Sequence, residues 1–265
     1  MIVSIDEIAE DTCLLDARWA LGAEPGAGRT AYLEGHLPGA RFLDVDAVLT
    51  GPATDPLLGR HPLPGVAQLE AGLGALGVDA ARPIVVYDIP GSFAAGRAWW
   101  VLRWAGLDAR VLDGGLPTWV AAGRPMETGE PPEPVPTTVT LTTGHLPVID
   151  ADQAAAWPGT LIDARAAERF RGETEPIDPV AGHIPGAVNR PVTDFWAADG
   201  TLPDETTLRA RLDPLAQPVA VYCGSGVSAA QVLLALAALD IPAALFPPSW
   251  SGWSADPTRP VATGP

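Results

Sequence analysis

One cysteine in the last third of the chain is placed where a sulfur could act as a nucleophile. Cys223 follows the apolar run 219–222 and precedes the Gly- and Ser-rich segment 224–228, after which a long Ala- and Leu-rich run spans 229–239. This order predicts a strand, a tight loop and a helix. Backbone N–H groups and the positive end of the helix dipole converge at a helix N-terminus, where they favour a thiolate over a thiol. The pattern indicates a reactive cysteine, although a free cysteine is also often buried and inert.

The composition describes an acidic globular protein. The 265 residues are 47% hydrophobic and 18% charged, and the formal net charge is −16. This length is enough for two domains, and the apolar content is enough for a sizeable core. The negative charge argues against nucleic acid and against an anionic membrane surface as partners. A small anionic substrate would need a local cluster of arginines to offset this field.

The two cysteines and the first residues of the chain indicate the cellular compartment in which we expect the protein. Cys13 and Cys223 form neither a CxxC pair nor a metal-binding pattern, so we expect no disulfide, no metal and a cytoplasmic location. Cys13 begins an apolar run and is predicted to lie in the core. The first eleven residues hold four acidic and no basic side chains, so we expect no signal peptide. The apolar stretch 227–246 is interrupted by Asp240 and a proline, which predicts a buried helix and then a strand, without a membrane span.

An internal repeat relates the two halves of the chain. The matched segments are 14–18 with 161–165, 35–40 with 182–187, and 84–88 with 219–223. Two of these matches share one offset, so we predict a tandem domain duplication, with a period too long for a solenoid. Both copies contain a Gly-His turn, so His36 and His183 are predicted to be structural, and the duplicated Asp-Ala-Arg motifs are predicted to form ion pairs or strand-end caps. Asp88 stands where Cys223 stands, so the first copy is predicted to be inactive.

The alternation of short apolar runs with longer helical runs predicts the α/β class. We expect two tandem domains, each with a mostly parallel central sheet flanked by helices. The expected limits are 1–125 for the inactive copy, 126–144 for a Pro/Glu-rich linker and 145–265 for the catalytic copy. In the second half we expect strands near 161–163, 219–222 and 243–246, and helices near 150–156, 204–212 and 227–239. Functional sites in such sheets form at the C-terminal ends of strands, which is where Cys223 is expected.

Taken together, these motifs resemble the tandem-domain sulfurtransferases of the rhodanese family. The resemblance covers nearly the whole chain and rests on both duplicated motifs, the segment 163–173, the cysteine loop and the Trp-rich segment 250–257. It implies two rhodanese-like α/β domains with the active cysteine in the second and no metal or organic cofactor. It also implies transfer of a sulfane sulfur from a small-molecule donor to cyanide or a thiol through a persulfide on Cys223. A thioredoxin-like reductant is a further expected partner.

The resemblance also assigns roles within the site. Members that prefer 3-mercaptopyruvate usually carry Cys-Gly-Ser-Gly-Val-Thr, and this chain carries Cys-Gly-Ser-Gly-Val-Ser. A hydroxyl, an imidazole and a carboxylate in series can relay a proton, and a guanidinium suits a carboxylate. The implied set is Cys223 as nucleophile, Ser225, His61 and Asp46 as proton relay, the backbone N–H groups of Gly224, Gly226, Val227 and Ser228 as persulfide cradle, and Arg169 as the group that binds the donor anion. Asp44 is an alternative to Asp46.

Three positions depart from the family pattern and leave alternatives open. Ile177 stands where a second arginine usually follows Glu-Pro, and Pro248 and Gly252 stand where a Gly and a Glu are usual. Because Ile177 weakens the case for 3-mercaptopyruvate, a thiosulfate:cyanide sulfurtransferase is the first alternative. A persulfide carrier without turnover is an alternative of another class. A cysteine phosphatase would need an arginine where the chain has Ala229.

Overall fold

The computed structural model describes residues 1–265, which form two compact units. Unit 1 comprises Met1–Gly51, Pro64–His145 and Ala197–Leu202, and unit 2 comprises Pro52–Leu63, Leu146–Trp196 and Pro203–Pro265. Each unit therefore includes one short segment from the half of the chain that mostly builds the other unit. The segment Pro52–Leu63 brings Arg60 and His61 into the unit that contains Cys223.

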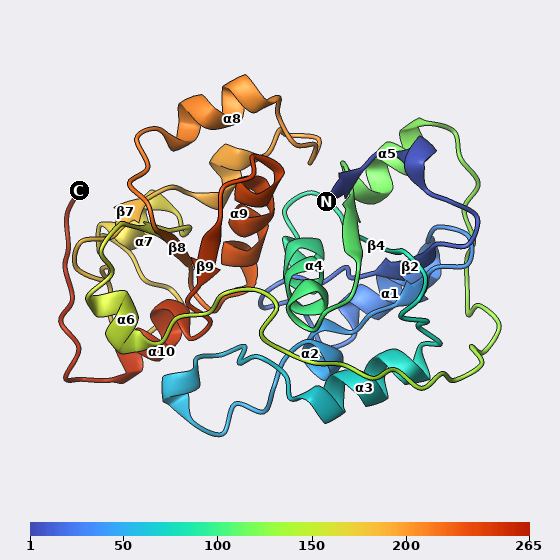
Figure 1. Ribbon diagram of the computed structural model, residues 1–265, viewed down its shortest axis with the longest axis horizontal. Helices are drawn as coiled ribbons and strands as arrows, with labels where there is room; N and C mark the ends of the chain where they lie inside the picture. Colours follow the sequence, from blue (N-terminus) through green and yellow to red (C-terminus); the bar gives the residue numbers. More distant parts are fainter. The chain divides into compact units, whose positions relative to one another are not determined.

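Unit 1 is built on a five-stranded parallel sheet of order β1-β5-β4-β2-β3. Its strands are β1 (Ile2–Val3), β2 (Cys13–Asp16), β3 (Arg41–Phe42), β4 (Ile84–Tyr87) and β5 (Ala109–Leu112). Its helices are η1 (Ile5–Glu7), α1 (Ala27–Glu34), α2 (Val45–Val48), α3 (Val66–Ala75), α4 (Ala94–Trp104) and α5 (Gly115–Ala121). Every residue of the central strand β4 is buried, as expected for a parallel strand covered on both faces. Figure 1 shows α4 alongside β4.

Unit 2 repeats this arrangement with a four-stranded parallel sheet of order β7-β6-β8-β9. Its strands are β6 (Thr160–Asp163), β7 (Val188–Asn189), β8 (Val219–Tyr222) and β9 (Ala243–Leu245). Its helices are η2 (Pro56–Leu58), α6 (Ala151–Ala155), α7 (Ala167–Phe170), η3 (Val192–Phe195), α8 (Glu205–Leu212), α9 (Val227–Ala238) and α10 (Ser249–Ala255). Val148 pairs with Leu245 of β9 in an isolated parallel bridge. Val148 therefore lies beside β9 as β1 lies beside β5 in unit 1. The predicted α/β fold class, with two parallel sheets flanked by helices, is confirmed.

The expected elements of the second half agree with the structure to within about two residues at each end. Helix α6 begins one residue later than expected because the Asp150 carboxylate caps it, accepting the N–H of Gln153 at 2.8 Å. Asp204 caps α8 in the same way. The apolar stretch 227–246 forms α9 and then β9, as predicted, and Figure 1 shows α9 beside β9. None of the helices combines the length and hydropathy that crossing a bilayer requires.

The duplicated Asp-Ala-Arg motif forms a buried ion pair in each unit. Arg18 lies 2.8 Å from Asp16, and Arg165 lies 2.7 Å from Asp163. Each arginine also donates to the carbonyl of the glycine that opens the Gly-His turn, at 2.7 Å and 2.6 Å. The ion pair therefore ties the end of a strand to this turn, and the predicted structural role is confirmed.

The two histidines of the repeated turn also occupy equivalent buried positions. His36 stacks on Tyr32 and His183 stacks on Phe170, with ring centroids 4.0 Å and 3.7 Å apart. The Nδ1 atom of each histidine hydrogen-bonds the backbone carbonyl of the residue on which it stacks, at 2.9 Å and 2.7 Å. Both histidines hold the turn against the preceding helix, which confirms their structural role.

The Pro-rich segment after α5 is packed on unit 1. Glu127 forms an antiparallel bridge with His36, and the N–H of Leu141 donates to a Glu70 carboxylate oxygen at 2.9 Å. Val139 and Leu141 are buried. Residues 126–144 therefore contribute apolar surface to unit 1 although they contain no helix or strand.

Both cysteines are free, and their surroundings differ. Cys13 begins β2 and is only partly buried, which is less than expected for a core position, because it lies at the N-terminal edge of the sheet. Burial raises the pKa of its thiol above the ordinary value. Cys223 is buried at the opposite, C-terminal end of a strand.

Candidate active site

The loop between β8 and α9 places the sulfur of Cys223 at a helix N-terminus. Gly226 caps α9 with a φ of 85°, a left-handed conformation that favours glycine. The Gly226 N–H donates to the Cys223 Sγ at 3.1 Å, and Cys223 is 2% exposed. The N–H of Cys223 donates to the Ser249 Oγ at 3.2 Å, which fixes the start of the loop. The sulfur thus lies where N–H donors and the dipole of a 12-residue helix stabilise an anion.

A serine and a histidine form a hydrogen-bonded pair beside this loop. The Ser225 Oγ lies 2.7 Å from the His61 Nδ1, and the two residues are only 5% and 7% exposed. Ser225 comes from the cysteine loop, whereas His61 comes from the segment Pro52–Leu63. A hydroxyl bonded to an imidazole in a buried site can pass a proton. The structure therefore brings together two of the three residues expected to form the relay.

The third expected residue, Asp46, lies in α2 of unit 1. Its carboxylate is exposed and accepts the Trp19 Nε1–H at 3.0 Å. Asp44, the alternative, is the N-cap of α2 and accepts the N–H groups of Asp46 and Ala47 at 3.0 Å and 2.9 Å. Because Asp44 is engaged in capping, Asp46 is the better of the two carboxylates for any other role.

Arg169, the expected anion-binding residue, is held by two buried carboxylates. Its Nη2 lies 2.6 Å from Glu175 Oε1 and 3.2 Å from Asp178 Oδ2, and its Nε donates to Glu175 Oε2 at 3.1 Å. The carboxylates are 4% and 2% exposed, and the Arg169 side chain is 15% exposed. Burial acts to raise the pKa of Glu175, but the bonds from Arg169 and from two backbone N–H groups outweigh it and lower that pKa. Glu175 therefore stays ionised and orients the guanidinium.

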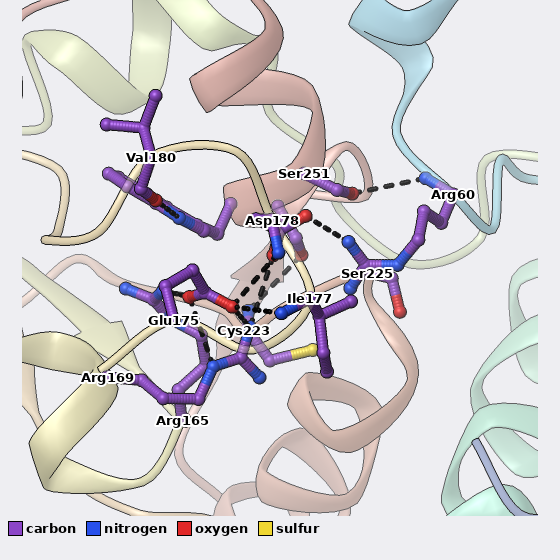
Figure 2. Close-up of polar contacts among 12 residues, drawn as sticks. Arg60, Arg165, Arg169, Glu175, Ile177, Asp178, Val180, Cys223, Ser225 and Ser251 are labelled. Carbon is purple, nitrogen blue, oxygen red and sulfur yellow. Dashed lines mark hydrogen bonds and ion pairs between the residues drawn. The ribbon is translucent and has the colours of Figure 1, made fainter. Parts of the chain in front are cut away.

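A further arginine completes this network. Arg60 forms an ion pair with Asp178 through its Nη1, and Ser251 Oγ accepts its backbone N–H at 3.1 Å. Burial raises the pKa of Asp178 above the ordinary value, although the charge of Arg60 opposes the shift. The result is a chain of alternating charges that begins at Asp163, which pairs with Arg165. Figure 2 shows its continuation through Arg165, Glu175, Arg169, Asp178 and Arg60. Each internal charge in the chain has an opposite charge on both sides, which offsets the cost of burying it.

Both guanidiniums at the end of this chain flank the residue that follows the nucleophile. A Cβ atom on Gly224 would lie 3.1 Å from Arg60 Nη2 and 3.7 Å from Arg169 Nη1. Position 177 contributes no cation, and Ile177 is 44% exposed. The sequence motifs indicate Arg169, with Arg171 as a weaker candidate, and do not indicate Arg60. The only signal for Arg60 in the sequence was its place next to His61.

Gly252 is a departure from the family pattern that has a steric explanation. A Cβ atom on Gly252 would lie 2.6 Å from the Leu57 carbonyl oxygen, closer than real contacts allow. A Cβ on Gly59 would lie 2.4 Å from the Pro248 carbonyl oxygen. The segment that contains η2 therefore packs backbone to backbone on α10, and this close contact positions Arg60 and His61. Nothing in the structure gives the proline side chain at position 248 a functional role.

The strand order, the shared turn and the buried cysteine loop define the class of protein. Two parallel α/β units, of which only one carries a cysteine between its central strand and a helix, are the architecture of a tandem rhodanese. The rhodanese-like domain model matches residues 4–122 and 149–256, so the chain belongs to this family.

Individual relatives match over nearly the full length. A Mycobacterium tuberculosis protein named "Putative thiosulfate sulfurtransferase SseB" is 47% identical over 267 residues, covering 97% of this chain and 93% of that protein. A Pseudomonas aeruginosa protein named "Probable 3-mercaptopyruvate sulfurtransferase" is 44% identical over 274 residues, covering 96% and 93%. The crystal structure of SseA from Escherichia coli, titled as a 3-mercaptopyruvate sulfotransferase, has a TM-score of 0.79 at 34% identity, covering 93% and 94% of the two chains. The predicted family and the prediction of a sulfurtransferase enzyme are confirmed.

Proposed function

We propose that this sulfurtransferase takes sulfur from 3-mercaptopyruvate and passes it to cyanide or a thiol through a persulfide on Cys223. The observation that carries the proposal is the 2.7 Å contact between His61 Nδ1 and Ser225 Oγ, two residues from the nucleophile. Breaking the C–S bond of 3-mercaptopyruvate leaves a carbanion that must gain a proton. Breaking the S–S bond of thiosulfate releases sulfite and needs no proton on carbon. A buried Ser-His pair whose serine belongs to the cysteine loop therefore favours the carbon-based donor.

The first half-reaction is an attack by the Cys223 thiolate on the donor sulfur. A new S–S bond forms, the C–S bond breaks, and its electron pair leaves with the carbon as the enolate of pyruvate. The donor thiol proton passes through Ser225 and His61 to the enolate carbon, which gives pyruvate and an ionised persulfide. Arg169 binds the donor carboxylate, as its guanidinium geometry allows. Asp46 is proposed as the carboxylate that supports the relay.

The second half-reaction returns the enzyme to its starting state. The acceptor, cyanide or a thiolate, attacks the outer sulfur of the persulfide, the S–S bond breaks, and the Cys223 thiolate is released. The N–H of Gly226, which already reaches the sulfur at 3.1 Å, is proposed to cradle the persulfide with those of Gly224, Val227 and Ser228. A thioredoxin-like reductant is proposed as a thiol acceptor and the cytoplasm as the compartment. Residues 1–125 and 145–265 are proposed as the limits of the two rhodanese copies.

Thiosulfate remains the second candidate donor, and two observations favour it. Ile177 is exposed and apolar where a mercaptopyruvate site would gain from a cation. The relative at 47% identity is named for thiosulfate. A persulfide carrier without turnover is the third candidate, since it would use the same cysteine.

Steady-state sulfur transfer to cyanide with each donor tests the proposal. We expect the wild-type protein to prefer 3-mercaptopyruvate, and Cys223→Ser to abolish turnover with both donors without unfolding the chain. Ser225→Ala should lower kcat for 3-mercaptopyruvate by about a hundredfold and should leave thiosulfate turnover nearly unchanged. A wild-type preference for thiosulfate would contradict the proposed donor. Absence of turnover with both donors would favour the carrier.

A further inference from the structure

Arg60 lies beside Gly224, the residue that follows Cys223, with two of its donor atoms unused. Its Nη1 pairs with Asp178 and its backbone N–H donates to Ser251. Its Nε and Nη2 are shielded from solvent and have no hydrogen-bond partner. Buried guanidinium N–H groups are costly to leave unsatisfied, so an unpaired set at the edge of a site indicates a place for an anionic ligand.

Arg169 offers a matching unused atom. Its Nε and Nη2 are occupied by Glu175 and Asp178, whereas its Nη1 makes no hydrogen bond. The unused Nη2 of Arg60 and the unused Nη1 of Arg169 lie 3.1 Å and 3.7 Å from the Cβ position of Gly224, and the occupied Nη2 of Arg169 lies at 3.8 Å. Two free guanidinium nitrogens therefore converge beside the residue that follows Cys223, which suits the two oxygens of one carboxylate.

Asp178 sets the spacing between the two cations. Its carboxylate is 2% exposed, and it binds Arg60 through Oδ1 and Arg169 through Oδ2. Because both contacts use one short side chain, the guanidiniums are held together despite their like charge (Figure 2). The contact between Gly252 and Leu57 keeps the segment that carries Arg60 against α10.

We propose that Arg60 is a second cation of the donor site and binds, together with Arg169, the carboxylate of a 2-oxo acid thiol. Asp178 is the positioning residue that holds the two guanidiniums at a fixed spacing. The proposal rests on the proposed function, since it assigns the anionic end of the same donor. It also explains how the site dispenses with a cation at position 177, because the charge comes from the segment Pro52–Leu63 instead.

Donor kinetics give the first test. Arg60→Gln should raise KM for 3-mercaptopyruvate at least about tenfold with a smaller effect on kcat, since it removes binding shared by ground and transition states. Arg60→Lys should restore part of this loss, because a point charge keeps attraction but not the fork geometry. Arg171→Gln is the matched control, because Arg171 is 38% exposed and pairs only with Glu173, and its KM should change less than about twofold. An unchanged KM for 3-mercaptopyruvate in Arg60→Gln overturns the proposal. A KM raised for thiosulfate alone also overturns it, because Arg60 would then bind the SO3 group of thiosulfate and not a carboxylate.

Alkylation of Cys223 gives a second test that needs no sulfur donor. Iodoacetate and iodoacetamide both lose iodide to the thiolate, but only iodoacetate carries a carboxylate. Arg60→Gln and Asp178→Asn should slow iodoacetate at least about fivefold more than iodoacetamide, relative to the wild-type protein and to Arg171→Gln. Equal slowing of both reagents would mean that Arg60 acts on the thiolate itself and would overturn the proposal. If wild-type protein fails to use 3-mercaptopyruvate, the proposed function fails, yet this ratio still decides whether Arg60 selects a carboxylate.

Discussion

The two units place different side chains at the equivalent strand end, Cys223 after β8 in unit 2 and Asp88 after β4 in unit 1. In unit 2 the Cys223 Sγ accepts the N–H of Gly226, and in unit 1 an Asp88 carboxylate oxygen accepts the N–H of Ala95 at 2.9 Å. Helix α9 begins four residues after Cys223, whereas α4 begins six residues after Asp88. In both loops a backbone N–H near a helix N-terminus therefore donates to the side chain at the end of the strand. In unit 1 this side chain is a carboxyl group, which cannot form a persulfide.

The surroundings of the two loops differ as much as the side chains of Cys223 and Asp88 do. Around Cys223 the structure collects Ser225, His61 and the guanidiniums of Arg60 and Arg169. Around Asp88 the partners are backbone N–H groups and Ser92. The duplicated fold therefore supplies a loop with a backbone N–H donor in both units. The side chains that we propose for the chemistry surround only the loop of unit 2.

The largest effect is expected from making unit 2 resemble unit 1. Cys223→Asp should lower sulfur transfer by at least about a thousandfold, because a carboxylate cannot form a persulfide. Thermal unfolding should remain cooperative, since Asp88 shows that the fold accepts a carboxylate at this position. The reverse change, Asp88→Cys in a Cys223→Ser background, should restore no transfer. Measurable turnover in that double variant would mean that the loop alone suffices.

A smaller effect is expected at the histidine that has no counterpart in the other unit. His61→Asn should lower kcat for 3-mercaptopyruvate by about a hundredfold, because it removes the imidazole that we propose to relay a proton with Ser225. His36→Asn, which changes a duplicated histidine, should leave kcat within about twofold and should lower stability by about 1–2 kcal/mol through loss of a buried bond and a ring stack. Measurement of kcat and urea unfolding for both variants separates the two roles. Equal losses of kcat would contradict the distinction.

A substitution that disturbs the packing of the segment Pro52–Leu63 on α10 should have an intermediate effect on the donor KM. Gly252→Ala places a Cβ 2.6 Å from the Leu57 carbonyl oxygen, so the segment must shift, at a cost of about 1–3 kcal/mol. The shift should move Arg60 and raise the donor KM about threefold to tenfold. Thr118→Ala serves as control and should leave the kinetics unchanged, because Thr118 is the fourth residue of α5 in unit 1 as Gly252 is the fourth residue of α10. An unchanged KM in Gly252→Ala would show that the close contact does not position the arginine.

The smallest effect is expected from Asp88→Asn, and it should be a change in stability that depends on pH. Burial raises the pKa of Asp88 to about 6, against hydrogen bonds from the Ala95 N–H and Ser92. A carboxyl group with a raised pKa in the folded state binds its proton more tightly there than in the unfolded chain. Its contribution to stability is therefore full below pH about 4 and is lost as pH rises through about 6. Urea unfolding between these values should show Asp88→Asn gaining stability relative to wild type as pH increases. A constant difference across this range would contradict the raised pKa.

Much of the fold could be predicted because its signals are local. The alternation of β-branched runs with Ala- and Leu-rich runs predicted β8, α9 and β9, and the repeat predicted the second parallel sheet. The exact ends of the helices were harder to predict. Asp150, for example, was expected inside α6 but is its N-cap, because a pattern of apolar residues does not distinguish a capping residue from the first residue of a helix. The segment 126–144 was expected to be a linker, and its packing on unit 1 depends on contacts such as Leu141 with Glu70, which lie far apart in the chain.

For the candidate site, the sequence by itself determined the nucleophile and its loop. Cys223, the glycines beside it and the helix that follows are neighbours in the chain, so their geometry is a property of local backbone conformation. Only the tertiary structure decided which distant side chains complete the site. Arg60 reaches Gly224 because its segment packs on α10 through Gly252, and Asp178 holds it beside Arg169. Such contacts depend on burial and on steric fit between segments that are distant in sequence, and no pattern of neighbouring residues encodes them.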